Sequence, residues 1–373
     1  MLILKDEVQG LHIVRYLSCA ELPVEVRNAM RQAEMLSIEQ GYDWYLNLIN
    51  TVYPGDSGIR IFVLSVDKQI FAVLPVRVVR ESGSVVVEAL ANYYTSLYQP
   101  YIAEHATVEV MAALFRAILV DCPNSYKFTF APLNTQCLGY AKLKKAMSNA
   151  GLVPFSYFCF GNWYLEVNKT WSEYLKSRPS QLRHTITRKA KSFQRLNGEL
   201  ELIQTSDRLE YGIEAYQKVY RTSWKVPEPY PYFMPGLIRM LEKNGWLRLG
   251  IATLDGKPVA AQVWIVAYGR AYIYKLAYDE AHKSLSAGSL LSAMLMKHVL
   301  DLDKVSEVDY LTGDDAYKAA WMSGRRERWG LVAYNQKTAR GFFGACWEMV
   351  WHLLKPSLSK IRKPSVRHGG RHG

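Results

Sequence analysis

One segment of this chain occurs twice, and the repeat limits the folds open to it. Residues 59–76 read IRIFVLSVDKQIFAVLPV, and residues 247–264 read LRLGIATLDGKPVAAQVW. Each copy has two strand-like runs around a short polar turn, which predicts a β-hairpin, and the Asp255-Gly256 pair is a strong turn signal. The copies lie 188 residues apart, a spacing that indicates duplicated domains and not a solenoid.

The same order of elements follows each hairpin. After the first we expect a strand, an apolar helix and a strand over 84–90, 107–120 and 126–131. After the second, the matching segments are 270–278, 288–302 and 307–312. Further helices are expected at 22–40, 171–196, 208–224 and 232–244. This alternation predicts an α/β (α+β) fold of tandem duplicated domains, each a mixed, mostly antiparallel sheet flanked by helices.

We expect the domain boundary near Gly161, within a strand over 154–167 that links the halves. The chain then divides into an N-terminal domain, 1–161, a C-terminal domain, 162–340, and a segment 341–373. A length of 373 residues, with 49% hydrophobic and 21% charged residues, suits two globular domains.

Cysteine usage and the absence of long apolar runs indicate a cytoplasmic protein. The five cysteines are scattered and lack metal-ligand spacing, so we expect free thiols and no metal site. The N-terminus lacks the apolar core of a signal peptide. No run of 18 apolar residues occurs, so we expect no transmembrane helix.

The net charge of +12 is concentrated in two segments. Between Glu173 and Glu199 there are seven basic residues and no acid, and from Lys355 to the end there are six basic residues and no acid. The first segment, a helix over 176–196, is either a solvated face or a site for an anionic partner such as tRNA.

The second basic segment follows an apolar, tryptophan-bearing stretch, 341–354, that is too short to span a bilayer. Together they resemble an interfacial anchor for acidic lipids, which would place the protein peripherally at the inner membrane. The alternative is a terminal helix docked on the second domain and followed by a basic tail.

Chemistry-bearing residues gather in two loops of the second copy. In the first loop, residues 279–289, small residues open the helix 288–302. Unpaired amides at a helix start favour an anion, so this loop suits a pyrophosphate, and an ordinary serine-capped helix is the alternative.

The second loop follows the strand 307–312. Asp309 lies inside an apolar run, where a carboxylate is costly unless it is paired or catalytic. Asp314, Tyr317 and Lys318 follow at the carboxyl end of this strand, where open α/β sheets bind ligands. A polar turn with a buried, structural aspartate is the alternative.

These loops carry a family resemblance. The sequences A-Y-D-E-A-H-K-S-L-S-A-G-S-L-L (277–291), V-D-Y-L-T-G-D-D-A-Y-K-A-A-W (308–321) and R-R-E-R-W-G-L-V-A-Y-N (325–335) resemble the CelD-like acetyltransferases of the GNAT superfamily, often linked to cellulose or exopolysaccharide production. The resemblance covers most of residues 162–336, and the first half fits only through the repeat. The fold is also similar to the Fem-type aminoacyltransferases, which use aminoacyl-tRNA.

The resemblance implies an acyltransferase of the EC 2.3 type with acetyl-CoA or another acyl-CoA as co-substrate. GNAT enzymes hold the pyrophosphate with [QR]-x-x-G-x-[GA], and Lys283-x-x-Ser286-x-Gly288 occupies that place with two departures. The implied cofactor-binding residues are Lys275, Ala277, Lys283, Ser286, Ala287, Gly288 and Ser289.

Attack of an amine or hydroxyl on a thioester needs a base, an acid and oxyanion donors. The resemblance gives strand amides near 274–277 as donors and Asp309 or Asp314 as the base. It gives Tyr317 as the acid for the leaving thiolate and Lys318 as a holder of an anion. The expected substrate contacts are Arg183, Arg188 and Trp224.

Three functions remain open. The first is an N- or O-acyltransferase acting on a sugar or polysaccharide precursor, favoured by the cluster of Asp309, Tyr317 and Lys318. The second is a Fem-like aminoacyltransferase, favoured by the basic helix 176–196. The third is a non-catalytic GNAT-fold factor in exopolysaccharide assembly, favoured by the altered pyrophosphate motif.

Overall fold

The computed structural model describes residues 3–4 and 10–361, and the strands in these ranges join into one mixed sheet of 14 strands. Their bounds are β1 Ile3–Leu4, β2 Leu11–Tyr16, β3 Ile59–Val66, β4 Gln69–Glu81, β5 Ser84–Ala89, β6 Tyr101–Ile102, β7 Ser125–Leu133, β8 Leu152–Glu166, β9 Gly198–Ile203, β10 Leu247–Leu254, β11 Lys257–Ala267, β12 Arg270–Tyr278, β13 Glu307–Asp309 and β14 Gly324–Asn335. The order across the sheet is β1-β2-β3-β4-β5-β7-β14-β8-β13-β12-β11-β10-β9, and β6 pairs beside β4.

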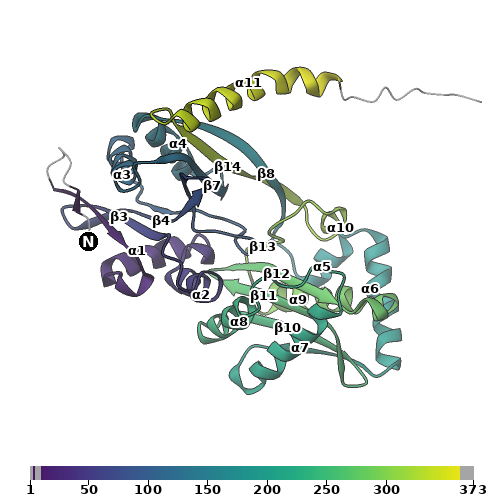
Figure 1. The fold of residues 1–373 in the computed structure, drawn as a ribbon. Coiled ribbons are helices and arrows are strands. Elements are labelled where there is room, and N and C mark those ends of the chain that lie inside the picture. The colour runs from purple at the N-terminus through teal and green to yellow at the C-terminus, as the bar shows by residue number, and fades with distance from the viewer. Residues whose placement is uncertain (1–2, 5–9, 362–373) are drawn as a thin grey trace, which may run out of the picture.

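Helices flank this sheet along its length (Figure 1). Their bounds are α1 Val24–Glu34, α2 Tyr42–Val52, α3 Val108–Asp121, α4 Leu138–Asn149, α5 Trp171–Lys176, α6 Ser180–Arg195, α7 Leu209–Arg221, α8 Phe233–Lys243, α9 Ala287–Asp301, α10 Ala316–Ala319 and α11 Ala339–Ile361, with short 3-10 turns η1 Cys19–Glu21, η2 Ile38–Gln40, η3 Ser206–Arg208 and η4 Glu280–Leu285. The predicted fold class, a mixed sheet flanked by helices, is confirmed.

The repeat is visible in the strand pairing. The hairpins β3–β4 and β10–β11 are antiparallel, and both turns have positive φ at their two central residues, as tight hairpin turns require. In each half the next strand then pairs in parallel with a strand beyond one helix. These pairs are β5 with β7 across α3, and β12 with β13 across α9.

Two long strands join the halves. β8 pairs with β14 along its whole length, and its last residues also pair with β13 of the second half. β14, although late in the chain, pairs on its other edge with β7 of the first half. The boundary expected near Gly161 therefore falls inside β8, at the point where the two halves share one sheet.

Three apolar cores support this arrangement. The first joins the halves, because α1 and α2 pack with α7 and α8 around residues such as Trp44 and Phe233. The second fills the first half beneath α3 and α4. The third lies beneath α9 in the second half, where Leu291 and Met296 are fully buried.

Several element bounds differ from the sequence prediction. The helix expected over 171–196 is two helices, because Pro179 takes an extended conformation between α5 and α6. The helix expected over 22–40 ends at Glu34. β13 ends at Asp309 and not at Thr312, because Leu311 adopts a left-handed φ of 53°.

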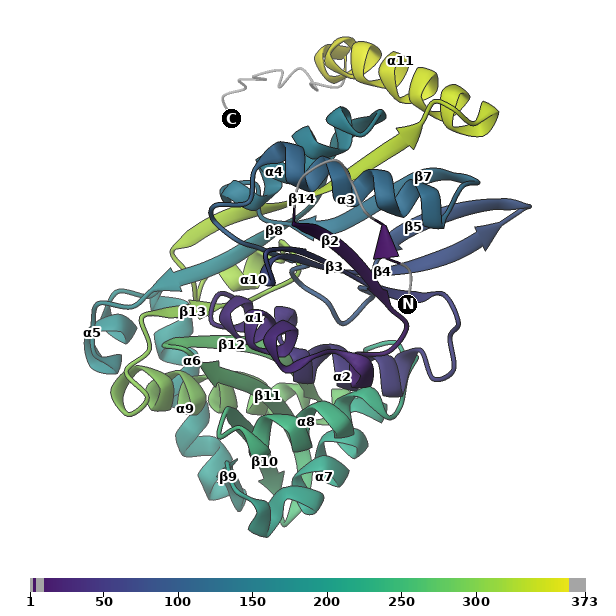
Figure 2. The ribbon, with the colours of Figure 1, turned by 90° about the vertical axis from the view of Figure 1, so that its left-hand side faces the viewer.

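The last helix, α11, lies at the outer edge of the molecule, at the opposite end from α7 (Figure 2). Its first turns pack on β14 and β7, where Ala345 is fully buried. Beyond them, large apolar side chains are exposed. None of the helices in the described ranges is long and apolar enough to cross a bilayer. The end of the predicted basic tail, 362–373, lies outside the described residues.

Candidate active site

The strands β12 and β13 separate shortly after they pair. Their parallel pairing runs from Arg270 opposite Glu307 to Tyr272 opposite Asp309 and stops there. Beyond it, the amide of Tyr310 donates to Trp163 on β8 at 2.9 Å, so this chain turns away from β12. A bulge at Tyr274 bends β12 at the same level. Residues 273–278 therefore present an edge that no described strand covers.

The helix α9 begins beside this opening without a side-chain cap. Ser286 precedes it with a left-handed φ of 56°, a conformation in which glycine is favoured. The amides of Ala287 and Gly288 make no hydrogen bond with any described residue, whereas those of the next two residues bond the carbonyl of Ser286. Two free donors at a helix start form a site that favours an anion.

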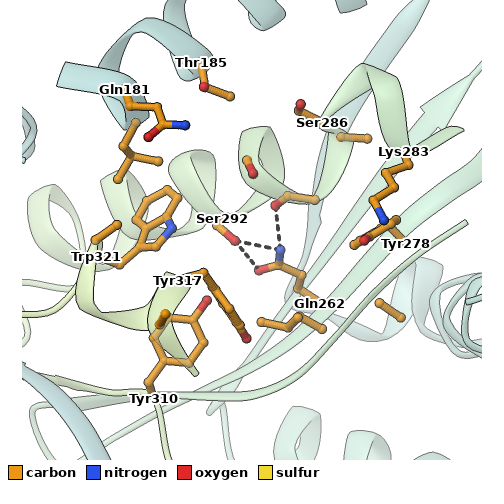
Figure 3. A pocket seen from close by; sticks show the side chains of 18 of the residues that line it. Gln181, Thr185, Gln262, Tyr278, Lys283, Ser286, Ser292, Tyr310, Tyr317 and Trp321 are labelled. Carbon is orange, nitrogen blue, oxygen red and sulfur yellow. Dashed lines mark hydrogen bonds between the residues drawn. The ribbon is translucent and has the colours of Figure 1, made fainter. Parts of the chain in front are cut away.

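A cavity of about 800 Å³ lies between this helix start, the open edge of β12, and α6 (Figure 3). Gln181 and Thr185 line it from α6, and Tyr278 and Lys283 line the side nearest the loop. Its lining also includes Trp224, Tyr310, Tyr317, Ala320 and Trp321. The cavity thus combines a long aromatic wall with the free amides of α9.

Gln262 on β11 holds the helix start in place (Figure 3). Its buried side chain donates to the carbonyl of Gly288 and to the hydroxyl of Ser292, both at 2.8 Å. The indole of Trp264 donates to the side-chain amide oxygen of Gln262 at 2.9 Å. Because these bonds fix the first turn of α9 against the sheet, the free amides point into the cavity in a defined position.

A second cavity, of about 350 Å³, adjoins the first. The two share Trp224, Leu276, Tyr310 and Tyr317 as lining residues. The second is also lined by three lysines, Lys225, Lys275 and Lys318, and by Asp315. The first half of the chain contributes the remaining wall through the loop at 93–96. The open strands therefore lie between two connected cavities.

Most of the residues expected to bind a cofactor gather around the first cavity. Its lining includes Ala277, Lys283, Ser286, Ala287, Gly288 and Ser289. Lys275 is placed differently, because its ammonium group lies in the second cavity, 3.5 Å from Glu228 and 3.2 Å from the hydroxyl of Tyr93. Its side chain therefore faces the second cavity and not the first.

Tyr317 and Lys318 lie where the two cavities meet. Tyr317 lines both, and burial raises the pKa of its phenol to about 12, so the group stays protonated at neutral pH. Lys318 lines the second cavity, and its ammonium group donates to the carbonyl of Thr312 and lies 3.3 Å from Asp315. Burial lowers the pKa of Lys318.

Asp309 has a structural environment. Its carboxylate pairs with Arg326 at 2.5 Å and accepts from the side chain of Asn162 at 2.6 Å and the amide of Leu311 at 2.7 Å. It is 3% exposed and lines neither cavity. The network ties β13 to β8 and β14 and gives this buried charge its partners.

Asp314 also lies outside both cavities. It forms a bidentate ion pair with Arg325, which holds the pKa of its carboxyl below the ordinary value. The carboxylate that does face the second cavity is the next residue, Asp315. Asp314 and Asp315 are neighbours in the sequence, and only the fold shows that their side chains point to different places.

The three expected substrate contacts are also divided. Trp224 lines both cavities. Arg183 and Arg188 are exposed on α6 and line neither cavity. The inner face of this helix closes the first cavity, and Lys189 ties it to the carbonyl of Ser284 at 2.6 Å.

Sequence reasoning missed Gln262, Lys225 and the aromatic pair Tyr93 and Tyr94. Gln262 stands in an apolar strand, where a buried polar residue is a usable signal. The tyrosines are far from the site in sequence, and the pattern offers no indication that their loop reaches the second half. Among the described residues, no group of three or more His, Cys, Asp or Glu side chains is arranged to hold a metal.

Comparisons with known proteins identify a domain family and similar folds. The family described as acetyltransferase (GNAT) domain matches residues 180–319, so the chain contains a GNAT acetyltransferase domain that includes both cavities' central residues. No curated protein matches the sequence.

Solved structures match over nearly the whole chain. The crystal structure of FemX is similar with a TM-score of 0.59 and 11% identity, over 85% of this chain and 97% of FemX. A conserved protein of unknown function from Bacteroides thetaiotaomicron VPI-5482 is similar with a TM-score of 0.52 and 12% identity, over 84% of this chain and 98% of that one. A tandem GNAT protein from the clavulanic acid biosynthesis pathway has a TM-score of 0.48 and 12% identity, over 86% of this chain and 98% of that one. At these identities, the two similarities with TM-scores above 0.5 show the fold alone.

Proposed function

We propose that this protein is an acyl-CoA-dependent N- or O-acyltransferase. The observation that supports this most strongly is the uncapped start of α9, whose two free amides open on an 800 Å³ cavity beside separated strands. The residues present suit an acyl-CoA. The amides of Ala287 and Gly288 would hold the pyrophosphate, with Lys283 beside them, and the aromatic wall would take the apolar part of the molecule.

The chemistry follows from the junction of the two cavities. The acceptor's amine or hydroxyl forms a bond to the thioester carbonyl carbon, and the carbon–sulfur bond breaks. Amides on the open edge of β12 stabilise the oxyanion. Tyr317 donates a proton to the departing thiolate, and Asp315, the carboxylate in the second cavity, accepts the proton lost by the nucleophile.

This assignment moves the base from the two aspartates expected from the sequence to Asp315. Its exposed carboxylate is held by Lys318 and is free of arginine partners, whereas Asp309 and Asp314 are each paired with an arginine. Asp315→Asn should lower kcat by about 100-fold and leave the affinity for CoA unchanged. Equal activity of this variant and wild type would remove Asp315 from the mechanism.

The first experiment is calorimetry with acetyl-CoA, free CoA and charged tRNA. Binding of both CoA species would support the proposal. Binding of charged tRNA alone would select a Fem-like aminoacyltransferase, and binding of none would select the non-catalytic GNAT-fold factor. The substrate class proposed from the CelD-like resemblance is a sugar or polysaccharide precursor in exopolysaccharide biosynthesis, which release of the CoA thiol in the presence of amino sugars would test.

The Fem-like alternative is supported by α6. Its side chains Arg183, Arg188, Lys191 and Arg195 are exposed and make no ion pair with any described residue, and the last three share one face of the helix. A basic face of this kind suits a nucleic-acid backbone. The double variant Arg188→Glu, Lys191→Glu should abolish tRNA binding and leave CoA binding intact, because neither residue lines a cavity. Unchanged tRNA binding, or none in wild type, would reject this partner.

We further propose peripheral contact of a cytoplasmic enzyme with the inner membrane through α11. Phe343, Trp347 and Leu354 lie along one stripe of this helix and are 70%, 71% and 50% exposed. The six basic residues from Lys355 onward would meet acidic headgroups. Full-length protein should float with liposomes containing phosphatidylglycerol, and Phe343→Glu, Trp347→Glu should not. Equal flotation of the two proteins would contradict membrane contact through this stripe.

A further inference from the structure

The second cavity has a wall that the first half of the chain supplies. Tyr93, Tyr94 and Ser96 belong to the loop after β5, and they face residues 273–276 of β12 across the cavity. The hydroxyl of Tyr274 donates to the carbonyl of Tyr94 at 2.9 Å, which fixes this loop to the second half. The cavity is therefore formed by both halves, beside the point where the acyl group would lie.

Three lysines reach this cavity, and two of them have carboxylate partners. Lys275 lies 3.5 Å from Glu228, and Lys318 lies 3.3 Å from Asp315. The Glu228 carboxylate is further held by the hydroxyls of Tyr94 and Tyr216. These two pairs leave the third lysine as an uncompensated positive charge in the wall.

That third lysine is Lys225. Its ammonium group makes no hydrogen bond or ion pair within the described residues, and it lies 5.7 Å and 5.6 Å from the ring centroids of Tyr220 and Trp224. The pKa of Lys225 is lowered to about 8, first by burial and then by the positive charges of Lys275 and Lys318, while Glu228 and Asp315 oppose the shift. An anion bound beside it would supply the missing partner.

Aromatic faces complete the cavity. Tyr93 is 62% exposed and stands over the Lys275 ammonium group, whose distance to its ring centroid is 4.2 Å. Tyr310 and Tyr317 meet edge to face on the side shared with the first cavity. Rings of this kind suit the flat face of a small cyclic molecule, and 350 Å³ accommodates one of monosaccharide size.

We propose that the second cavity binds an acceptor carrying a phosphate or carboxylate group, with Lys225 as its principal anchor. The anionic group would lie among the three lysines, and the acceptor's amine or hydroxyl would point past Tyr317 toward the thioester. The inference rests on the proposed acyl-transfer function and narrows its substrate class from any small acceptor to an anionic one.

The test uses calorimetry on the full chain, first with CoA alone and then, at saturating CoA, with three amino sugars. The probes are glucosamine 6-phosphate, the 6-carboxylate analogue of glucosamine, and glucosamine itself. At least one anionic sugar should bind tenfold or more tightly than glucosamine, and comparison of the two identifies the preferred anion. Binding should weaken as the pH rises above about 8, because Lys225 then loses its charge in the unliganded protein.

Two variants separate anchoring from folding. Lys225→Gln should weaken binding of the anionic sugar at least tenfold and leave CoA affinity unchanged, because the side chain holds no structural bond. Lys243→Gln, at the exposed end of α8, should match wild type. Failure of CoA to bind would contradict the proposed function. Normal CoA binding without any anionic sugar bound more tightly than glucosamine, or with full affinity in Lys225→Gln, would overturn the acceptor proposal alone.

Discussion

The two halves of the molecule share one topology and differ at the start of the helix that follows the third repeated strand. In the first half, the hydroxyl of Thr107 accepts from the amide of Val110 at 3.3 Å, and Glu109 lies in the first turn of α3. In the second half, α9 has no capping side chain and no acid in its first turn. In both helices the amides of the first two residues have no hydrogen-bond partner among the described residues, but only α3 has a capping side chain and an acid beside them.

The space beside the end of the parallel strand pair also differs: it is filled in the first half and open in the second. In the first half, Tyr98 fills it, because its amide donates to Pro132 beyond the end of β5 and its buried ring stacks on Phe130. In the second half, the corresponding edge of β12 faces two cavities. A duplicated fold can thus carry one site, because short local changes decide whether the backbone donors are covered or left open.

The largest effect should separate tyrosines of the two halves. Tyr317→Phe removes the proton donor at the junction of the cavities, so we expect kcat to fall by about 100-fold with little change in the affinity for CoA. Tyr101→Phe removes a hydroxyl from a cavity in the first half and should leave kcat unchanged. Acetyl transfer followed by CoA thiol release measures both. A loss of activity in both variants would place chemistry in the first half as well.

Adding an acid at the start of α9 and removing the acid at the start of α3 tests whether charge at these positions controls CoA binding. Ser289→Glu places a carboxylate in the cavity beside the free amides, so CoA binding should weaken by about 2 kcal/mol, or ~30-fold. The same charge favours the helix dipole, so the free energy of unfolding should not fall. The converse change in the first half, Glu109→Gln, removes the acid at the start of α3 and should leave CoA binding as in wild type. Calorimetric titration of both variants with CoA measures these affinities. Undiminished binding by Ser289→Glu would contradict the placement of the pyrophosphate at the start of α9.

The loop that fills the gap in the first half is held by a buried acid. Glu39 accepts from the amides of Ser96 and Leu97 and from the hydroxyl of Ser96, and burial raises its pKa to about 7. A raised pKa contributes stability that is present below about pH 4.5 and is lost as the pH rises through 7.

We therefore compare urea unfolding of wild type and Glu39→Gln from pH 5 to pH 8. The stability of wild type relative to the variant should fall by about 1–2 kcal/mol over this range. A difference that stays constant with pH would show that Glu39 does not titrate there.

The smallest effects concern the caps themselves. Thr107→Ala removes the cap of α3 and should lower the free energy of unfolding by about 1 kcal/mol. Ser286→Gly relieves a left-handed residue before α9 and should raise it by about 0.5–1 kcal/mol. Thermal or urea unfolding of the two variants measures both changes in the free energy of unfolding. Destabilisation by Ser286→Gly would mean that the serine side chain supports the loop.

The sequence was sufficient for the repeated hairpins, the strands that follow them and α9, because each depends on local patterning. It also indicated six of the residues that line the first cavity: Ala277, Lys283, Ser286, Ala287, Gly288 and Ser289. It could not assign Asp309, since a buried aspartate has the same local pattern whether it is catalytic or paired, and its partners Asn162 and Arg326 come from other strands. The same holds for Tyr94, whose contact with Tyr274 spans 180 residues.

The most direct test of the account is a structure of the protein with CoA. We predict pyrophosphate oxygens about 3 Å from the amide nitrogens of Ala287 and Gly288, with the thiol between β12 and Tyr317. CoA bound at the start of α3 or elsewhere on the surface, with the amides of α9 uncontacted, would contradict it.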